Sequence, residues 1–399
     1  MTRSLRNDRD RSRQTAGRPA TGRISVGLLS TYLPTRCGLA SFTAALRDSL
    51  LASRPGVDVG VVRVVDEPTW TSGTGVVYEL ATGRGGNPAA AAERLNRYDV
   101  VVVQHEYGIY GGPDGDQVLD VLSRLRVPVV VVLHTVLSEP TDHQRHVLEQ
   151  VAAAADTVVT MTRAGQRRLL AGYRIDQQKI VVISHGAWPG GRPEPAPKES
   201  HRPVVLTWGL LGPGKGVEWG IDALPGLRVL DPSPLYVVAG KTHPRVLARE
   251  GERYRDSLHE RAEALGVADL VRFEPGYLDL DSLRRLVSRA DVVLLPYDSH
   301  EQVTSGVLIE AVASLTPVVS TVFPHARELL ADGAGTLVPH GDPQAIGAAV
   351  HRVLTDPAHG AAMTARAARI APSLDWAGVA DRYWQVAEGL TGRQVGVAG

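Results

Sequence analysis

The residues best suited to chemistry form one segment in the second half of the chain. An apolar run at 291–296 predicts a buried strand, and Thr304, Ser305 and Gly306 then form a typical helix start. A helix start without a side chain in the way exposes backbone N–H groups and the positive end of the dipole, which favour phosphate. Glu310 follows one turn later on the same face, within reach of a ribose attached to that phosphate. The pattern predicts a nucleoside-diphosphate site, and an ordinary strand–loop–helix unit with a solvated glutamate is the alternative.

A glycine-rich loop offers a cation for the same phosphate. It follows the apolar run at 204–208 and includes Gly209, Gly214 and Lys215. A lysine beside the positive end of a helix is unfavourable unless an anion lies there. The spacing is not that of a P-loop, because Gly216 stands where Ser or Thr is required. We therefore expect Lys215 and helix amides to neutralise a diphosphate without a metal ion.

Two more glycine turns follow predicted strands. Gly240 and Lys241 end the run at 235–239, where a tight turn can accept a nucleobase; a solvent-facing lysine is the default for Lys241. Gly38 follows the first predicted strand and lets a phosphate or sugar approach the backbone, although an ordinary turn glycine explains it equally well. The full Gly-x-Gly-x-x-Gly fingerprint is absent here, which disfavours a Rossmann dehydrogenase.

Histidines end two predicted strands in the first half of the chain. His105 is followed by Glu106 and Tyr107, and His134 closes the next strand. We expect the two imidazoles to face one cleft and to bind a sugar hydroxyl or a phosphate, although a single strand-end histidine is more often structural. Our candidate acceptor contacts are Arg36, His105, Glu106 and Tyr107. No helix-spaced ligand pair supports a metal site.

Continuous apolar runs, rather than alternating ones, predict parallel strands buried on both faces. In the first half we place strands at 24–30, 57–65, 100–104, 127–133, 157–161 and 180–184, with helices at 41–52, 117–125, 142–154 and 163–172. In the second half we place strands at 204–208, 235–239, 271–273, 292–296, 317–320 and 335–338. The helices expected there are 216–224, 244–265, 281–288, 306–314, 326–330, 343–354, 360–370 and 375–390. The fold class is therefore α/β, with two doubly wound parallel sheets facing across a cleft.

The boundaries follow from composition. We expect a disordered basic tail at 1–23, a first Rossmann-like domain at 24–188, a proline-rich linker at 189–201, a second Rossmann-like domain at 202–372, a final helix at 373–390 and a loose tail at 391–399. The first 23 residues lack the apolar core of a signal peptide.

Composition also limits the class of function. Of 399 residues, 43% are apolar and 22% charged, and Lys plus Arg equals Asp plus Glu, so nothing points to nucleic acid. The single cysteine, Cys37, fits a reducing cytoplasm, and we expect it to be a small packed residue and not a nucleophile. No run approaches the ~20 apolar residues of a membrane span. Arginines and leucines mix at 163–170, which leaves peripheral contact with the inner face of the plasma membrane open.

These segments together resemble retaining glycosyltransferases of the GT-B fold, of the family-four type. The resemblance spans about residues 24–390. In the second half, Glu310 matches the second glutamate of a Glu-x7-Glu motif, and residues 311–321 and 335–342 resemble the family's "EAMACGxPVVAT" and "GxLVPPGD" segments. Lys215-Gly216 matches the family's phosphate loop. In the first half, residues 183–186 resemble "IPNG", and His134 matches a strand-end histidine.

The resemblance implies transfer of a mannosyl or glucosyl group from a nucleoside-diphosphate sugar, the co-substrate, with no cofactor required. The second domain would hold the donor, the first would hold a glycan, lipid or small-molecule acceptor, and the final helix would cross back to the first domain. The catalytic residues implied are His134, Lys215, Gln302 and Glu301. The donor contacts implied are Gly38, Gly209, Gly214, Gly240, Lys241, Thr304, Ser305, Gly306, Val307, Leu308 and Glu310. The oligomeric state stays open.

Two positions depart from the family pattern. Gln302 stands where the first glutamate of Glu-x7-Glu belongs, and Leu210 stands near the position of an arginine beside the phosphate loop. Gln302 can still hydrogen-bond a sugar but carries no charge. Arg36 or Lys241 would have to compensate for Leu210. These departures motivate one alternative, a catalytically degenerate nucleotide-sugar-binding protein. A GT-B phosphorylase and a nucleotide-sugar epimerase, which shares the fold, are the others.

Overall fold

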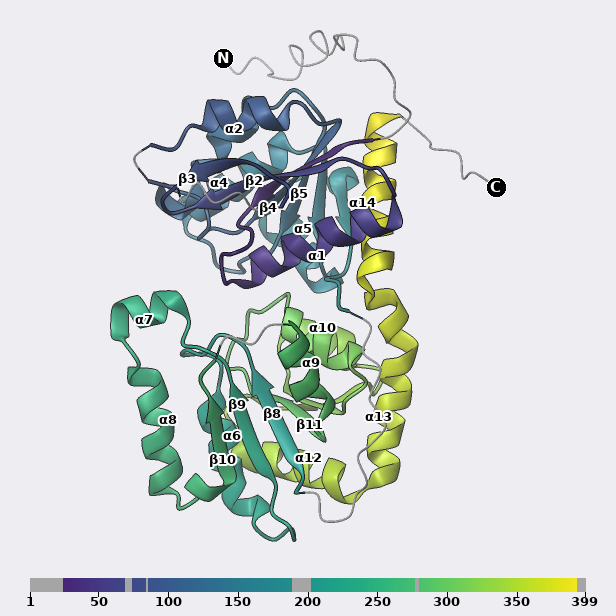
Figure 1. Cartoon of the computed structure of the whole chain (residues 1–399). Coiled ribbons are helices and arrows are strands. Elements are labelled where there is room, and N and C mark those ends of the chain that lie inside the picture. Colours follow the sequence, from purple (N-terminus) through teal and green to yellow (C-terminus); the bar gives the residue numbers. More distant parts are fainter. Residues whose placement is uncertain (1–23, 69–73, 84, 189–201, 277–279, 393–399) are drawn as a thin grey trace.

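The computed structural model describes residues 24–68, 74–83, 85–188, 202–276 and 280–392. Over these residues the chain forms two α/β domains, one above the other in Figure 1. The tails expected at 1–23 and 393–399 and the linker expected at 189–201 lie outside the described residues. Among the described helices, none is long and apolar enough to cross a membrane.

The N-terminal domain is built on seven parallel strands in the order β3-β2-β1-β4-β5-β6-β7. They are β1 (Val26–Ser30), β2 (Val59–Val65), β3 (Val76–Ala81), β4 (Val100–His105), β5 (Val129–Leu133), β6 (Thr157–Thr160) and β7 (Ile180–Val182). The helices are α1 (Gly38–Ser53), α2 (Pro88–Leu95), α3 (Val118–Leu122), α4 (Asp142–Ala154) and α5 (Arg163–Gly172). The strand order reverses between β1 and β4, so the carboxyl ends of these two strands flank the domain's switch point.

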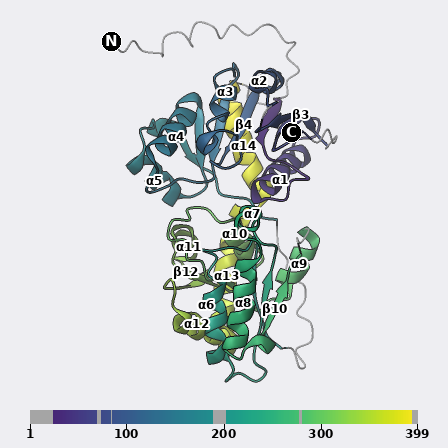
Figure 2. The ribbon, with the colours of Figure 1, turned by 90° about the vertical axis from the view of Figure 1, so that its left-hand side faces the viewer.

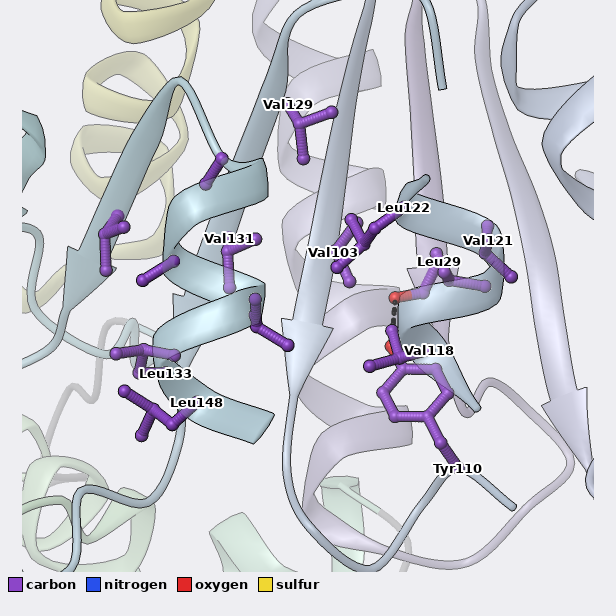
Figure 3. Close-up of a cluster of buried hydrophobic side chains, with 14 of the residues drawn as sticks. Leu29, Val103, Tyr110, Val118, Val121, Leu122, Val129, Val131, Leu133 and Leu148 are labelled. Atoms are coloured by element: carbon purple, nitrogen blue, oxygen red, sulfur yellow. Dashed lines mark hydrogen bonds between the residues drawn. The ribbon is translucent and has the colours of Figure 1, made fainter. Parts of the chain in front are cut away.

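The two faces of this sheet are covered differently. One face packs against α2, α3 and α4 in a cluster of valines and leucines, and Figure 3 shows Val131, Leu133 and Leu148 within it. Tyr110 lies in the same cluster, and its hydroxyl donates hydrogen bonds to the carbonyls of Leu29 and Gln104. The other face packs against α1 and the last helix of the chain. Burial on both faces explains the unbroken apolar runs of the sequence.

The C-terminal domain has six parallel strands in the order β10-β9-β8-β11-β12-β13. They are β8 (Val204–Trp208), β9 (Leu235–Ala239), β10 (Val271–Glu274), β11 (Val292–Leu295), β12 (Val318–Thr321) and β13 (Gly335–Val338). The helices are α6 (Val217–Leu227), α7 (Pro244–Glu250), α8 (Arg253–Ala264), α9 (Leu280–Ser288), α10 (Gly306–Ala313), α11 (Pro324–Leu330), α12 (Pro343–Thr355) and α13 (Pro357–Ile370). Here the order reverses between β8 and β11, which places the loops after these strands at the second switch point.

The last helix, α14 (Trp376–Thr391), returns to the N-terminal domain. It crosses α1, while α13 runs along the lower domain, as Figure 1 shows. Trp376, Tyr383 and Trp384 are buried in the cluster that covers this face of the upper sheet. Figure 2 shows the same two-tiered arrangement from the side, with α7 and α10 at the level where the domains meet. Thr162 and Gly108, which follow β6 and β4, form hydrogen bonds with Val303 and Arg245 of the other domain, so the carboxyl ends of strands from both sheets lie at the junction.

Several predicted elements need correction. β3 and α2 were not expected, because β3 is an edge strand with a mixed pattern and α2 is rich in alanine; the buried Arg63 of β2 forms an ion pair with Glu79 of β3. The helix expected at 244–265 is two helices, since Gly251 adopts a φ of 64° at the end of α7. α1 begins at Gly38, three residues earlier than expected, because the Cys37 sulfur accepts a hydrogen bond from the Ala40 N–H.

Candidate functional site

Two loops of the C-terminal switch point contact each other. The loop after β8 carries Lys215, and the loop after β11 leads to α10. The Asp298 N–H donates to the Gly214 carbonyl at 3.0 Å. A Cβ on Gly216 would lie 1.8 Å from the Pro296 carbonyl oxygen, so only glycine permits this approach. The two sequence segments that we singled out for phosphate are thus brought together.

Lys215 lies over an aromatic ring. Its Nζ is 4.3 Å from the centre of the Tyr297 ring, and the side chain is half-buried. No carboxylate pairs with it among the described residues, and burial lowers the pKa of Lys215 to about 8. The ammonium group therefore keeps its charge at neutral pH in a site without a counter-ion from the described part of the protein. An anionic ligand would supply that counter-ion.

The start of α10 is open on its amide side. The Ser305 hydroxyl accepts from the Leu308 N–H at 3.2 Å, and the Ser305 N–H donates to His325 Nδ1 at 2.9 Å. The N–H groups of Gly306 and Val307 find no acceptor among the described residues. Two backbone donors at a helix N-terminus are suited to a phosphate oxygen. Of the two hydroxyls expected to cap this helix, only that of Ser305 does so, and Thr304 does not.

Glu310 lies one turn into α10 and is half-buried. Burial raises its pKa to about 7, while a hydrogen bond from the Trp208 side chain and the charge of Arg284 oppose that rise. Trp208 is the last residue of β8, so the carboxyl group lies beside the start of the Lys215 loop. A carboxylate in this place can accept hydrogen bonds from the two hydroxyls of a ribose.

The glycines near the donor loops divide into two groups. Gly240 has a φ of 139°, and a Cβ there would lie 1.9 Å from the Gly209 carbonyl oxygen, so close contact of two loops already requires a glycine. Gly214 has a φ of 87° with no neighbour within 4 Å of a Cβ, and Gly38 has open space beside it as well. Lys241 is exposed, and its side chain has no partner among the described residues.

The N-terminal strand ends carry neutral imidazoles, of which His134 is half-buried and His105 is buried. His134 Nε2 lies 2.7 Å from Gln104 Oε1, which leaves Nδ1 as the ring nitrogen available to a substrate. Burial, with His185 and His105 nearby, lowers the pKa of His134 to about 3. His105 is 1% exposed, and neither ring nitrogen has a partner among the described residues. An acceptor could touch His105 only after the covering residues moved.

The remaining acceptor candidates flank this edge. The Thr135 hydroxyl donates to Glu106 at 2.5 Å, and burial raises the pKa of Glu106. The Tyr107 hydroxyl donates to the Gln144 carbonyl at 3.3 Å. Arg36 is exposed in the loop before α1, and Arg245 of α7 donates to the Gly108 carbonyl from the other domain. These residues therefore lie at the β4 end of the junction between the domains.

Direct contacts join the two domains beside α10. The Thr162 hydroxyl donates to the Val303 carbonyl at 2.9 Å. The Glu328 carboxylate accepts from the N–H groups of Arg163 and Ala164 at 2.8 and 2.7 Å, so a residue of α11 caps α5. Such a cap cannot be read from the sequence, because the partners lie about 165 positions apart.

The two remaining catalytic candidates differ in what binds them. The Glu301 carboxylate pairs with Arg168 of α5 at 3.0 Å, so this residue is engaged with the N-terminal domain. Gln302 is half-buried, and its side-chain amide donates to the Thr304 carbonyl at 3.0 Å, leaving the amide oxygen for a ligand. Leu210 is half-buried and brings no charge to the phosphate loop.

Sequence reasoning missed two histidines at this junction. His325 of α11 accepts from the Ser305 N–H, and His185 follows β7 and lies against Gly306. The available signal for His185 was its place directly after an apolar strand, the same signal that drew attention to His105 and His134. Across the described segments, no three His, Cys, Asp or Glu side chains converge as a metal site.

Two family models match the chain. The model described as glycosyl transferases group 1 matches residues 193–370, which contain Lys215, Gly306 and Glu310. The model described as glycosyltransferase family 4 matches residues 44–187, which contain His105 and His134. The chain belongs to the group 1 glycosyltransferases of the family-four type. The resemblance inferred from the motifs is therefore confirmed.

Curated proteins of this family include moderately similar relatives. A D-inositol 3-phosphate glycosyltransferase of Kineococcus radiotolerans is 31% identical over 268 residues, covering 60% of this chain and 58% of that protein. A glycogen synthase of Mycobacterium tuberculosis is 31% identical over 278 residues, covering 65% of this chain and 63% of that protein. The chain thus spans less than two thirds of the length of these relatives.

Solved structures of glycosyltransferases share the fold. Anabaena Alr3699/HepE in complex with UDP and glucose superposes with a TM-score of 0.71 at 18% identity, covering 92% of this chain and all of that one. The sucrose-phosphate synthase of Thermosynechococcus elongatus superposes with a TM-score of 0.73 at 17% identity, covering 93% of this chain and all of that one. Together with the two parallel sheets, these likenesses confirm the GT-B fold class.

Proposed function

We propose that the chain transfers a hexosyl group from a nucleoside-diphosphate sugar to a hydroxyl of an acceptor. The observation that carries the proposal is the C-terminal switch point, where Lys215, the free N–H groups at the start of α10 and Glu310 occupy neighbouring loops. Relatives in the family are described as acting on inositol phosphate or as mannosyltransferases dependent on GDP-mannose, and a solved neighbour holds UDP-glucose. These descriptions support a hexosyl donor with a nucleotide.

In the proposed reaction the bond between the anomeric carbon and the diphosphate oxygen breaks, and a bond to the acceptor oxygen forms. Lys215 and the N–H groups of Gly306 and Val307 stabilise the negative charge on the departing diphosphate. Glu310 binds the ribose, and the free Nδ1 of His134 meets the sugar. The acceptor's proton passes to an oxygen of the leaving phosphate, so no protein base is required.

We further propose that the product retains the anomeric configuration. A proton transfer to the leaving group on the same face of the sugar removes the need for the paired carboxylates of a glycosidase. Proton NMR of the first product formed from an α-linked donor tests this step, since retention gives an α-glycoside. A β-glycoside as the first product contradicts it.

The proposed donor site needs no metal ion, because one ammonium group and two helix amides face the diphosphate. Transfer should therefore continue at the same rate in EDTA. Loss of activity in EDTA, with recovery on addition of Mg²⁺ or Mn²⁺, contradicts this part of the proposal.

One experiment separates the proposed function from its rivals. The protein is screened by thermal shift against UDP-, GDP-, ADP- and TDP-sugars, because a specific ligand raises apparent stability. The best donor is then incubated with glycan, lipid and small-molecule acceptors, and nucleoside diphosphate release is measured. A donor that binds but is never turned over favours a degenerate binding protein, for which Leu210 and Gln302 provide the motive. Release of a sugar 1-phosphate that depends on inorganic phosphate favours a phosphorylase.

A further inference from the structure

The imidazole ring of His185 lies between the two domains, beside the start of α10. It follows β7, and its Nδ1 lies 2.6 Å from the Gly186 carbonyl oxygen. A carbonyl can only accept, so Nδ1 carries the proton of this hydrogen bond. In the neutral ring Nε2 is then the nitrogen with a free lone pair, and it is an acceptor.

The free nitrogen faces the proposed donor site. A Cβ on Gly306 would lie 2.9 Å from His185 Nε2, so this nitrogen lies against the first residue of α10. The N–H groups of Gly306 and Val307, which we assign to the phosphate, belong to the same turn. Nε2 has no hydrogen-bond partner among the described residues, and the side chain is half-buried rather than sealed.

Aromatic side chains fix the orientation of the ring. Phe42 of α1 packs edge-on at 5.0 Å between ring centres, and Trp376 of α14 lies at 5.6 Å. A Cβ on Gly186 would lie 2.2 Å from the Trp376 indole, so the backbone beside His185 is equally confined. Packing from two helices thus holds Nε2 toward Gly306, as a preorganised binding group requires.

The chemistry of the surrounding groups indicates what Nε2 would bind. The Lys215 ammonium group and the α10 amides are all donors, and they suit a phosphate. A sugar also brings hydroxyl protons, which need acceptors. Of the other imidazoles nearby, His325 already accepts from Ser305 through Nδ1. His134 is held by Gln104 through Nε2, and its free Nδ1 lies at the end of β5 in the N-terminal domain and not at Gly306. His185 Nε2 is the remaining ring acceptor beside Gly306 in the described part of the junction.

We propose that His185 is a catalytic residue whose Nε2 accepts a hydrogen bond from a sugar hydroxyl at the transfer centre. The hydroxyl belongs either to the donor hexose or to the incoming acceptor. This assignment rests on the proposed function, because it requires the donor phosphate at the start of α10. It adds a contact that the family motif "IPNG" does not contain, because this motif has Asn where the chain has His185.

The test replaces the ring without losing its packing. His185→Phe keeps an aromatic side chain against Phe42 and Trp376 but removes both nitrogens, whereas His185→Gln provides an amide oxygen near the position of Nε2. Loss of one hydrogen bond should reduce affinity or rate about tenfold in the Phe variant, and the Gln variant should recover most of it. His146→Phe, on the exposed surface of α4, is the matched control.

Two measurements locate the hydroxyl. Binding of UDP-glucose and GDP-mannose is compared with binding of UDP and GDP, and steady-state transfer gives the KM for the acceptor. A weaker affinity for the nucleotide sugar with unchanged affinity for the nucleotide assigns the hydroxyl to the donor hexose. Unchanged donor binding with a higher acceptor KM assigns it to the acceptor.

The failure of this proposal is distinct from failure of the proposed function. If the wild-type protein binds the donor and His185→Phe equals it in donor affinity, acceptor KM and kcat, the role of His185 is wrong and the donor site stands. If the wild-type protein binds neither nucleotide sugar nor nucleotide, the proposed function is wrong and the hydroxyl assigned to His185 is lost with it. Equal defects in the Phe and Gln variants at normal melting temperature also overturn the acceptor role.

Discussion

The two domains share one architecture but present different chemistry where their strands end. The C-terminal edge carries a charged lysine over Tyr297, two free amides and Glu310. The N-terminal edge carries the imidazoles of His105 and His134, whose pKa values burial lowers to about 4 and about 3. At neutral pH the lysine is charged and these imidazoles are not.

In the transfer reaction that we propose, the contrast assigns a different task to each domain. A diphosphate requires positive charge and N–H donors, which the C-terminal switch point supplies. A sugar hydroxyl requires neutral groups that can donate and accept, which histidines supply. Both edges arise from the same reversal of strand order, so the difference lies in the loop residues and not in the topology.

The largest effect is expected when Lys215, the cation of the C-terminal edge, is removed. Lys215→Met should reduce kcat/KM for transfer about 1000-fold, the upper range for losing one preorganised group at a developing charge. The melting temperature should stay the same or rise, because burial that lowers the pKa of Lys215 to about 8 also makes the charged side chain unfavourable in the folded protein. Nucleoside diphosphate release and thermal unfolding measure the two effects.

Lys215→Arg is the matched variant, since it keeps the charge and loses only the exact placement of the ammonium group. It should retain more activity than Lys215→Met. Wild-type turnover in Lys215→Met would mean that Lys215 does not stabilise the diphosphate. The charge difference between the two edges would then play no part in the reaction.

The next test concerns the ribose. Glu310→Gln should raise the donor KM about 10- to 100-fold with little change in kcat, as expected when a hydrogen bond to a charged group is lost. Because the ribose is common to donor and product, UDP and GDP should lose affinity to the same extent. Inorganic pyrophosphate, which has no ribose, should bind as before. Glu260→Gln on the exposed face of α8 is the control.

Much of this site could be predicted from the sequence, because its parts are local. An apolar run followed by Thr304, Ser305 and Gly306 specifies a strand, a turn and a helix within about twenty residues, and the switch-point rule then places that turn in a cleft. The strand ends at His105 and His134 followed from the same logic. Each motif needed only its own neighbours in the sequence.

What the sequence could not predict depends on residues far apart in the chain. Glu328 caps α5 across the domain junction, and His185 is aimed at Gly306 by Phe42 and Trp376 from two other helices. The edge strand β3 escaped for a related reason: its Glu79 is stabilised by Arg63 of the neighbouring strand, a pairing that no local pattern records. Tertiary packing determines these features, and local secondary-structure propensity does not predict them.

The third test is the pH dependence of donor binding. Donor affinity should fall about tenfold for each pH unit below or above its optimum. Burial raises the pKa of Glu310 to about 7, so below pH 7 the free protein increasingly carries a neutral carboxyl that accepts ribose hydroxyls poorly. Burial lowers the pKa of Lys215 to about 8, so above pH 8 the ammonium group is lost. Donor affinity should therefore peak between about pH 7 and pH 8.

The two limbs of that profile can be assigned separately by calorimetry across pH. Glu310→Gln should flatten the acid limb, and Lys215→Arg should flatten the alkaline limb. The imidazoles of the N-terminal edge should contribute nothing in this range, because the pKa of His134 lies near 3 and that of His185 near 4. An acid limb that persists in Glu310→Gln would place the titrating group elsewhere.

The smallest expected effect concerns the junction that brings the two edges together. Glu328→Ala removes the carboxylate that caps α5 from the other domain, and losing such a cap costs about 1 kcal/mol. If the cap favours the arrangement in which the edges face each other, the donor KM should rise about fivefold while kcat changes little. Glu328→Gln keeps an acceptor oxygen and should lie nearer the wild type. A fall in melting temperature with an unchanged KM would show that the cap stabilises the fold without setting the distance between the edges, and the two domains would then act as independently positioned halves of the site.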